Sequence, residues 1–205
     1  MMRLLLATVV CGLLLTSTFA AAQTIDAGEF VPNYHPITMG GRFDWFRTSS
    51  VGPVSLLLAG PISAGFGTAV DHPKEYGTHW DGFGKRYGMR LTGISTGSAI
   101  EASLGSLWSE DPRYFPSPDR HFGARVKYVV KSTFLAPHRD GTWHPAYARF
   151  AGNVGNNFLS NTRRADSEAG AGDAAIRCIW GVTNRMAGQA FAEFWPDVKR
   201  LIFKH

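Results

Sequence analysis

The chain opens with an apolar segment that follows the pattern of a secretory signal peptide. Arg3 supplies a positive charge, residues 4–15 are almost entirely apolar, and the small residues 20–22 satisfy the small-x-small cleavage rule. The apolar run is too short to cross a bilayer comfortably. We predict a cleaved leader over residues 1–22 and a mature chain that begins at Gln23. The alternatives are a buried N-terminal helix and a membrane anchor.

A second apolar segment, residues 51–70, contains no charged residue. Its length matches that of a membrane-spanning helix, and Arg47 and Asp71 bound it. Pro53 and Pro61, together with four glycines, would break a regular helix in water, although both residue types are common in membrane helices. Three interpretations follow: a kinked or re-entrant membrane helix, a helix pair buried in a soluble core, or an apolar linker.

The clearest long helix is predicted over residues 78–108. Thr78 and Asp81 have the spacing of a capping box, and no proline interrupts the segment. Glycines recur four residues apart, at 84 and 88 and again at 93 and 97, so each pair forms a smooth groove on one helix face. Such grooves suit both membrane helices and tight packing in a soluble core.

The other segments predict shorter elements. Residues 23–50 contain prolines, glycines and scattered aromatic residues and predict an irregular arm. Residues 124–135 fit a strand and a helix equally well. The dipeptide Asp140–Gly141 predicts a turn, with a hairpin between Phe134 and Trp143.

Two further helices are expected near the C-terminus. One begins at Pro145, where a missing N–H is harmless, and runs to about Ser160. A polar loop over 163–173 precedes the last helix, which Asp173 can cap and Pro196 ends. Apolar residues at spacings of three and four predict the buried face of that helix: Ile176, Ile179, Thr183, Met186, Ala190 and Phe194.

These patterns predict a mainly α fold, a bundle of four to five Gly-rich helices with a small β-hairpin and an irregular N-terminal arm. The expected organisation is a signal peptide (1–22), an aromatic arm (23–50) and a single helical domain (51–205). The mature chain of about 180 residues is long enough for one domain with its own core.

Composition changes this picture only slightly. Charged residues make up 18% of the chain, below the usual quarter, which fits tightly packed or lipid-facing helices. Removing Arg3 lowers the formal net charge from +5 to about +4, and no basic run exceeds two residues, so we expect no nucleic-acid partner. Cys178 is the one cysteine left after cleavage and is interpreted as a small buried hydrophobe.

The sequence lacks the common catalytic motifs: a nucleophile elbow, a phosphate-binding loop, a zinc-protease helix and the ordered series of a lipid phosphatase. Its densest polar cluster covers residues 110–127. In one interpretation this cluster binds an anionic ligand. In the other, the run Asp111–Phe115 is a folded corner in which Arg113 bonds carbonyl groups. The candidate ligand-binding residues are Arg113, Tyr114, Arg120, His121 and Arg125.

Three polar residues are candidates for burial: Arg90, Glu101 and Asn156. Arg90 and Glu101 lie about 16 Å apart along one helix, too far to pair, so each needs a partner on another element. For Glu101 the candidates are Arg149, Arg163 and Asn156. A buried glutamate is either a general acid or base, or a paired structural carboxylate.

His138 and His144 can face each other across the predicted turn. We identify no third ligand for a metal, and we predict no metal site and no cofactor.

Part of the chain resembles a family of secreted bacterial proteins with no established activity. The resemblance covers about residues 76–165 and rests on the run from Trp80 to Gly88, on Asp111–Phe115 and on Gly152–Asn161. It implies an extracytoplasmic location and supplies no catalytic residue.

We therefore expect an extracytoplasmic envelope protein without enzymatic activity, associated with a membrane through small-residue helix packing. Its expected partners are membrane lipid or other envelope proteins. The alternative is a secreted enzyme or ligand-binding domain that uses the 110–127 cluster. The sequence leaves open which of the two is correct.

Overall fold

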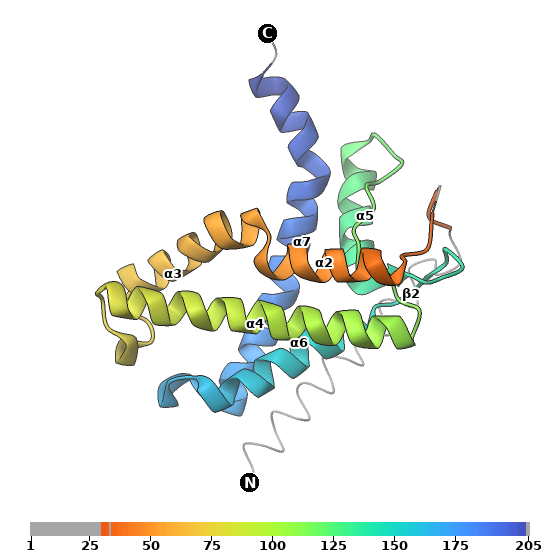
Figure 1. Cartoon of the computed structure of the whole chain (residues 1–205). Coiled ribbons are helices and arrows are strands. Elements are labelled where there is room, and N and C mark those ends of the chain that lie inside the picture. Colours follow the sequence, from red (N-terminus) through yellow and green to blue (C-terminus); the bar gives the residue numbers. More distant parts are fainter. Residues whose placement is uncertain (1–29, 33, 204–205) are drawn as a thin grey trace.

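The computed structural model describes residues 30–32 and 34–203. The fold is mainly helical with one small hairpin, as predicted (Figure 1). The predicted leader and the first part of the arm lie outside the described residues. In chain order the elements are α2 (Met39–Val51), η1 (Val54–Ala59), α3 (Gly60–Ala69), η2 (Lys74–Tyr76), α4 (Trp80–Leu107), α5 (Phe122–Phe134), β1 (Leu135–Pro137), β2 (Trp143–Pro145), α6 (Tyr147–Leu159), η3 (Ser160–Arg163), η4 (Asp166–Glu168) and α7 (Ala171–Ile202).

A single interrupted helix, made of α2, η1 and α3, runs from Met39 to Ala69. Thr38 caps its start by accepting a hydrogen bond from the Gly41 N–H. Pro53 has no N–H to donate, and the six residues after it form a wider π-helical turn before α3 begins. The predicted irregular arm is therefore helical from Met39, and the linker interpretation of residues 51–70 is wrong.

The long helix predicted over 78–108 is confirmed as α4, but its capping box is not. His79 occupies the N-cap position of α4 without a side-chain hydrogen bond to the backbone. Asp81 lies in the first turn, where it pairs with Lys85 at 2.7 Å instead of closing a capping box with Thr78.

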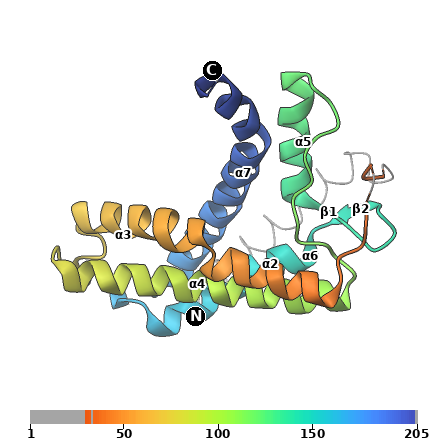
Figure 2. The same cartoon turned by 45° about the horizontal axis from the view of Figure 1, so that its top comes forward.

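Helix α4 lies at the centre of the molecule. Helices α2 and α3 pack along one side of it and α6 packs along the other (Figure 1). Helix α7 crosses this layer steeply, contacts α6, and continues alongside α5 (Figure 2).

The apolar core is small and lies at the hairpin. Strands β1 and β2 are antiparallel, with Ala136 paired to His144, and Gly141 occupies the left-handed region that the turn requires (φ 82°). Val31, Leu135 and Trp143 are buried together there, which confirms the predicted hairpin. The ambiguous segment 124–135 is helical apart from its last residue.

Helix α6 starts two residues later than predicted. Pro145 belongs to β2, and the next residue extends the hairpin because the Ala146 N–H donates to the Phe134 carbonyl at 3.0 Å. The helix therefore begins at Tyr147 and ends at Leu159.

Helix α7 differs from the prediction in its end and in its orientation. It continues past Pro196 to Ile202. Its predicted buried face is also wrong, because Ile176 and Ile179 are 55% and 51% exposed. The buried positions are small or polar: Ala174, Ala175, Cys178, Gln189 and Glu193. Polar partners set this orientation, since Gln189 accepts hydrogen bonds from the hydroxyl groups of two α5 residues, Ser132 and Thr133.

Candidate functional site

Two arginines of the predicted anionic-ligand cluster, Arg113 and Arg125, bind two different carboxylates of the chain itself. Arg113 forms a forked pair with Asp111, at 2.7–3.2 Å, and donates to the His35 carbonyl at 2.7 Å. Asp111 is fully buried and also accepts a hydrogen bond from the Tyr34 hydroxyl. This arrangement matches the folded-corner interpretation, in which Arg113 holds the chain together.

Tyr114 and Arg125 are brought together on a different carboxylate, that of Glu193 on α7. The Tyr114 hydroxyl donates to Glu193 at 2.6 Å, and Arg125 donates to the other carboxylate oxygen at 2.7 Å. Arg125 also pairs with Asp197, so it holds α7 on both sides of Pro196. Burial raises the pKa of Glu193, but the hydrogen bonds from Tyr114 and Arg125 outweigh burial and leave that pKa below its usual value.

Arg120 and His121 do not join either group. Both are exposed, and His121 contacts the neighbouring Asp119 at 3.0 Å. Because Arg113 and Arg125 already hold carboxylates of the chain itself, the structure assembles no shared anion site from the predicted residues.

Glu110, in contrast, has a role that the sequence did not indicate. Its buried carboxylate accepts the N–H groups of Ala148 and Arg149, at 2.8 and 3.2 Å, in the first turn of α6. These N–H groups have no partner within the helix, so Glu110 caps α6 from a distant point in the chain. Burial raises the pKa of Glu110, although Arg149 and the two N–H groups oppose that shift.

Glu101 is a paired structural carboxylate. It lies on α4 and accepts hydrogen bonds from Arg149 of α6 at 3.5 Å and from Arg185 of α7 at 2.8 Å. Arg149 was among the predicted partners, and its guanidinium also donates to three carbonyl groups at the end of α5 and the start of β1. Burial and the neighbouring Arg185 lower the pKa of Arg149 to about 10. Three helices are thus joined through one ion-pair network.

Asn156 and Arg90, which were predicted to be buried, are both half-buried and have different surroundings. Asn156 packs on Gly93 and Gly97 of α4, so this glycine pair accommodates a neighbouring helix as predicted. A side-chain carbon added at Gly84 or Gly88 would meet no atom within 4 Å, so no other helix packs on this glycine pair in the described part of the chain. Arg90 has a buried Nη1 atom without a hydrogen-bond partner in the described part of the chain.

The two histidines of the hairpin do face each other, with ring centroids 4.5 Å apart. Burial and the neighbouring His144 lower the pKa of His138. Within residues 30–32 and 34–203, no cluster of three metal-ligating side chains includes them.

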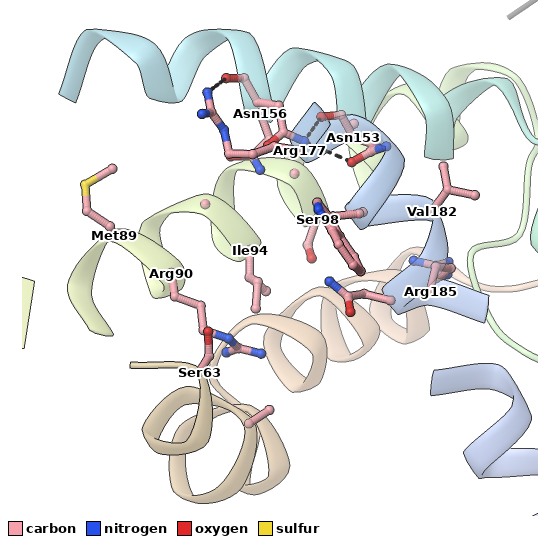
Figure 3. Close-up of a pocket in the computed structure, with 18 of the residues that line it drawn as sticks. Ser63, Met89, Arg90, Ile94, Ser98, Asn153, Asn156, Arg177, Val182 and Arg185 are labelled. Carbon is pink, nitrogen blue, oxygen red and sulfur yellow. Dashed lines mark hydrogen bonds between the residues drawn. The ribbon is translucent and has the colours of Figure 1, made fainter. Parts of the chain in front are cut away.

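A cleft of about 1070 Å³ lies between the inner faces of α3, α4, α6 and α7. Figure 3 shows Arg90 and Ile94 entering it from α4, Asn153 and Asn156 from α6, and Arg185 from α7. Glu101 also lines the cleft, together with several arginines and amides.

The outer face of the α2–α3 helix is apolar and uncovered. Seven residues, adjacent or three to four positions apart, are between 49% and 77% exposed, and we call them the outer stripe: Val51, Val54, Leu57, Leu58, Ile62, Phe66 and Val70. The inner face of the same segment carries the small residues Gly52, Ser55, Gly60 and Ala64. The interpretation of residues 51–70 as a helix pair buried in a soluble core is therefore wrong.

Among the described residues, the helix from Met39 to Ala69 is the one segment long and apolar enough to cross a membrane. Its mean hydropathy reaches 1.3, and 22% of the window with that value is buried.

Comparison with known proteins gives no relative for this chain: no family model, curated protein or solved structure matches it. The resemblance to secreted bacterial proteins therefore stays a prediction.

Proposed function

We propose that this chain is an extracytoplasmic protein of the bacterial envelope that associates with a membrane through the outer stripe. The observation that carries the proposal is the distribution of side chains along α2–α3. Small residues face the inside of the protein and large apolar residues face outward, which is the reverse of a surface helix in a soluble protein. Its location outside the cytoplasm rests on the signal-peptide pattern of residues 1–22.

Packing between α3 and α4 supports lipid as the surroundings of the outer stripe. A side-chain carbon on Gly60 would lie 2.5 Å from the Tyr87 ring, so these helices approach as closely as small residues allow. Membrane helices use small residues at their contacts and turn large apolar ones toward lipid. A soluble monomer rarely exposes a continuous apolar patch of this kind.

The dimensions and ends of the segment agree with this interpretation. The uncharged residues 51–70 extend over about 30 Å, close to the thickness of the hydrocarbon layer. Trp45 lies before this segment and Trp80 follows it after a short connection. Tryptophan is enriched where a membrane meets water.

The buried carboxylates favour a structural rather than a catalytic role for the interior. Glu101, Asp111 and Glu193 are each held by an arginine, and Glu110 is held by helix N–H groups. We therefore propose no reaction for this chain.

Flotation with phospholipid vesicles tests the proposal. Leu57→Ser, Ile62→Ser and Phe66→Ser together remove three exposed side chains, each of which contributes about 1.5–3 kcal/mol when transferred from water. We expect the combined variant to bind vesicles at least about a thousand-fold more weakly than the parent exported chain.

The matched control replaces three equally exposed apolar residues outside the outer stripe, by Leu107→Ser, Phe122→Ser and Leu159→Ser. This control should float with the vesicles. A parent chain that stays at the bottom of the gradient, or a stripe variant that floats as well as the parent, contradicts the proposal, provided that circular dichroism shows unchanged helix content.

A further inference from the structure

The cleft between α3, α4, α6 and α7 contains more positive charge than the chain itself neutralises. Four of its arginines pair with carboxylates: Arg86 with Asp71, Arg164 with Glu168, and both Arg149 and Arg185 with Glu101. Two other arginines of the cleft, at positions 90 and 177, have no carboxylate within salt-bridge distance in the described part of the chain.

Arg90 is the clearer of the two. Its Nη1 atom is buried without a hydrogen-bond partner, and burial lowers the pKa of the guanidinium. Figure 3 shows the side chain extending from α4 toward α3, on the side of the cleft where Ser63 lies. An unpaired guanidinium in such a place is unfavourable unless an anion reaches it.

Arg177 adds to the positive potential. Its donors meet only neutral oxygens, among them the carbonyl groups of Glu168 at 2.8 Å and Asn157 at 3.3 Å. Its Nε atom is buried without a partner in the described residues.

The rest of the lining determines the kind of anion that fits. A volume of about 1070 Å³ is far larger than a free phosphate or carboxylate ion needs. Much of the wall is apolar, with Leu58 and Ile62 from the α2–α3 segment, Ile94 from α4 and Trp180 from α7. A molecule that fills this cleft therefore combines a small anionic group with an apolar chain.

We propose that the cleft binds an anionic amphiphile, with its carboxylate or phosphate oxyanion against Arg90 and its acyl chain along the apolar wall. A guanidinium donates two parallel hydrogen bonds to either oxyanion, so both head groups share one chemistry. This inference does not rest on membrane association, because Arg90 and the other charged groups of the cleft lie outside the outer stripe, although Leu58 and Ile62 belong to both surfaces.

Thermal titration of the full exported chain in a non-ionic detergent tests the proposal. The probes are dodecanoate and dodecyl phosphate, with dodecanol as the neutral comparison and inorganic phosphate as the head group alone. We expect the two charged amphiphiles to raise the melting temperature, and dodecanol and inorganic phosphate to bind at least about ten-fold more weakly. Comparable effects of dodecanol, or of inorganic phosphate, would overturn the assignment.

Arg90→Met provides the decisive variant and Arg47→Met, at an exposed position on α2, its matched control. Arg90→Met should weaken binding of the charged probes about ten-fold or more and leave the affinity for dodecanol unchanged. It should melt no earlier than the parent, since it removes a half-buried charge that has no carboxylate partner in the described residues. Arg90→Gln should behave in the same way. Unchanged probe affinity, or a lower melting temperature in both Arg90 variants, would overturn the proposal. Both Arg90 variants should float with vesicles as the parent does, and this separates the test of the cleft from the test of the outer stripe.

Discussion

At the scale of single residues, the molecule is held together by buried carboxylates that each join two or more elements. Glu101 joins α4 to α6 and α7, Glu110 joins the end of α4 to α6, and Glu193 joins α7 to α5 and the loop before it. The apolar core at the hairpin is small, so these polar contacts carry much of the specificity of the fold.

Glu101→Gln tests this role directly. The variant leaves the buried guanidinium of Arg149 without a full counter-charge, which destabilises proteins by about 3–5 kcal/mol. Asp81→Asn, in the exposed pair with Lys85, should change stability by no more than about 1 kcal/mol. Denaturant unfolding of both variants measures the difference, and equal effects would show that Glu101 is not a central contact.

Glu193 predicts a pH dependence of stability. Its pKa in the folded protein is lowered, so its contribution is complete above the unfolded value and is lost as the pH falls through the folded one. We expect the stability difference between the parent and Glu193→Gln to be largest at pH 7 and to shrink from about pH 5 downward. Melting temperatures recorded from pH 7 to pH 3 check this, and a difference that grows toward low pH contradicts it.

At the scale of elements, close contact between α3 and α4 depends on Gly60. A side-chain carbon at this position would meet the Tyr87 ring at 2.5 Å and the Ser55 carbonyl at 2.9 Å. Gly60→Ala should therefore force the helices apart and destabilise the protein by about 1–3 kcal/mol.

Gly65→Ala is the control on the same helix. No atom lies within 4 Å of a side-chain carbon there, so the higher helix propensity of alanine should stabilise the protein by up to about 1 kcal/mol. Thermal unfolding distinguishes the two variants by the sign of the change. Destabilisation of similar size in both would contradict the close packing of α3 on α4.

The sequence predicted the positions of helices and turns better than it predicted which face of a helix is buried. The absence of proline defined α4, and Asp140–Gly141 identified the hairpin turn, because both signals are local. The buried face of α7 was predicted from the spacing of Ile176 and Ile179, which assumes that apolar residues point inward. That assumption fails here because Arg185, Gln189 and Glu193 find polar partners inside.

The candidate site was less predictable for a similar reason. Arg113 and Arg125 are close in sequence, but they bind different carboxylates. Arg113 binds the nearby Asp111, and Arg125 binds Glu193, which lies far along the chain and had no predicted role. Arg90 was predicted to be buried and is half-buried, whereas the cleft around it could not be predicted because it requires four helices to be placed in space.

At the scale of the whole molecule, the described chain has a partly polar interior and an extensive apolar exterior. Large apolar residues are exposed on α2–α3 and also along α7, where Phe191 and Leu201 are 59% and 78% exposed. The proposed contact of the outer stripe with lipid would account for this distribution along α2–α3, because apolar side chains would then remain out of water.

Collision accessibility of nitroxide labels in phospholipid vesicles tests this central claim most directly. Labels would be attached at Leu57→Cys, Ile62→Cys and Phe66→Cys, and at Lys85→Cys for comparison, each combined with Cys178→Ala. The account predicts that oxygen, which concentrates in lipid, relaxes the three stripe labels more than a water-soluble nickel complex does, and that the label at position 85 shows the reverse. Stripe labels that are relaxed more by the nickel complex than by oxygen would contradict it.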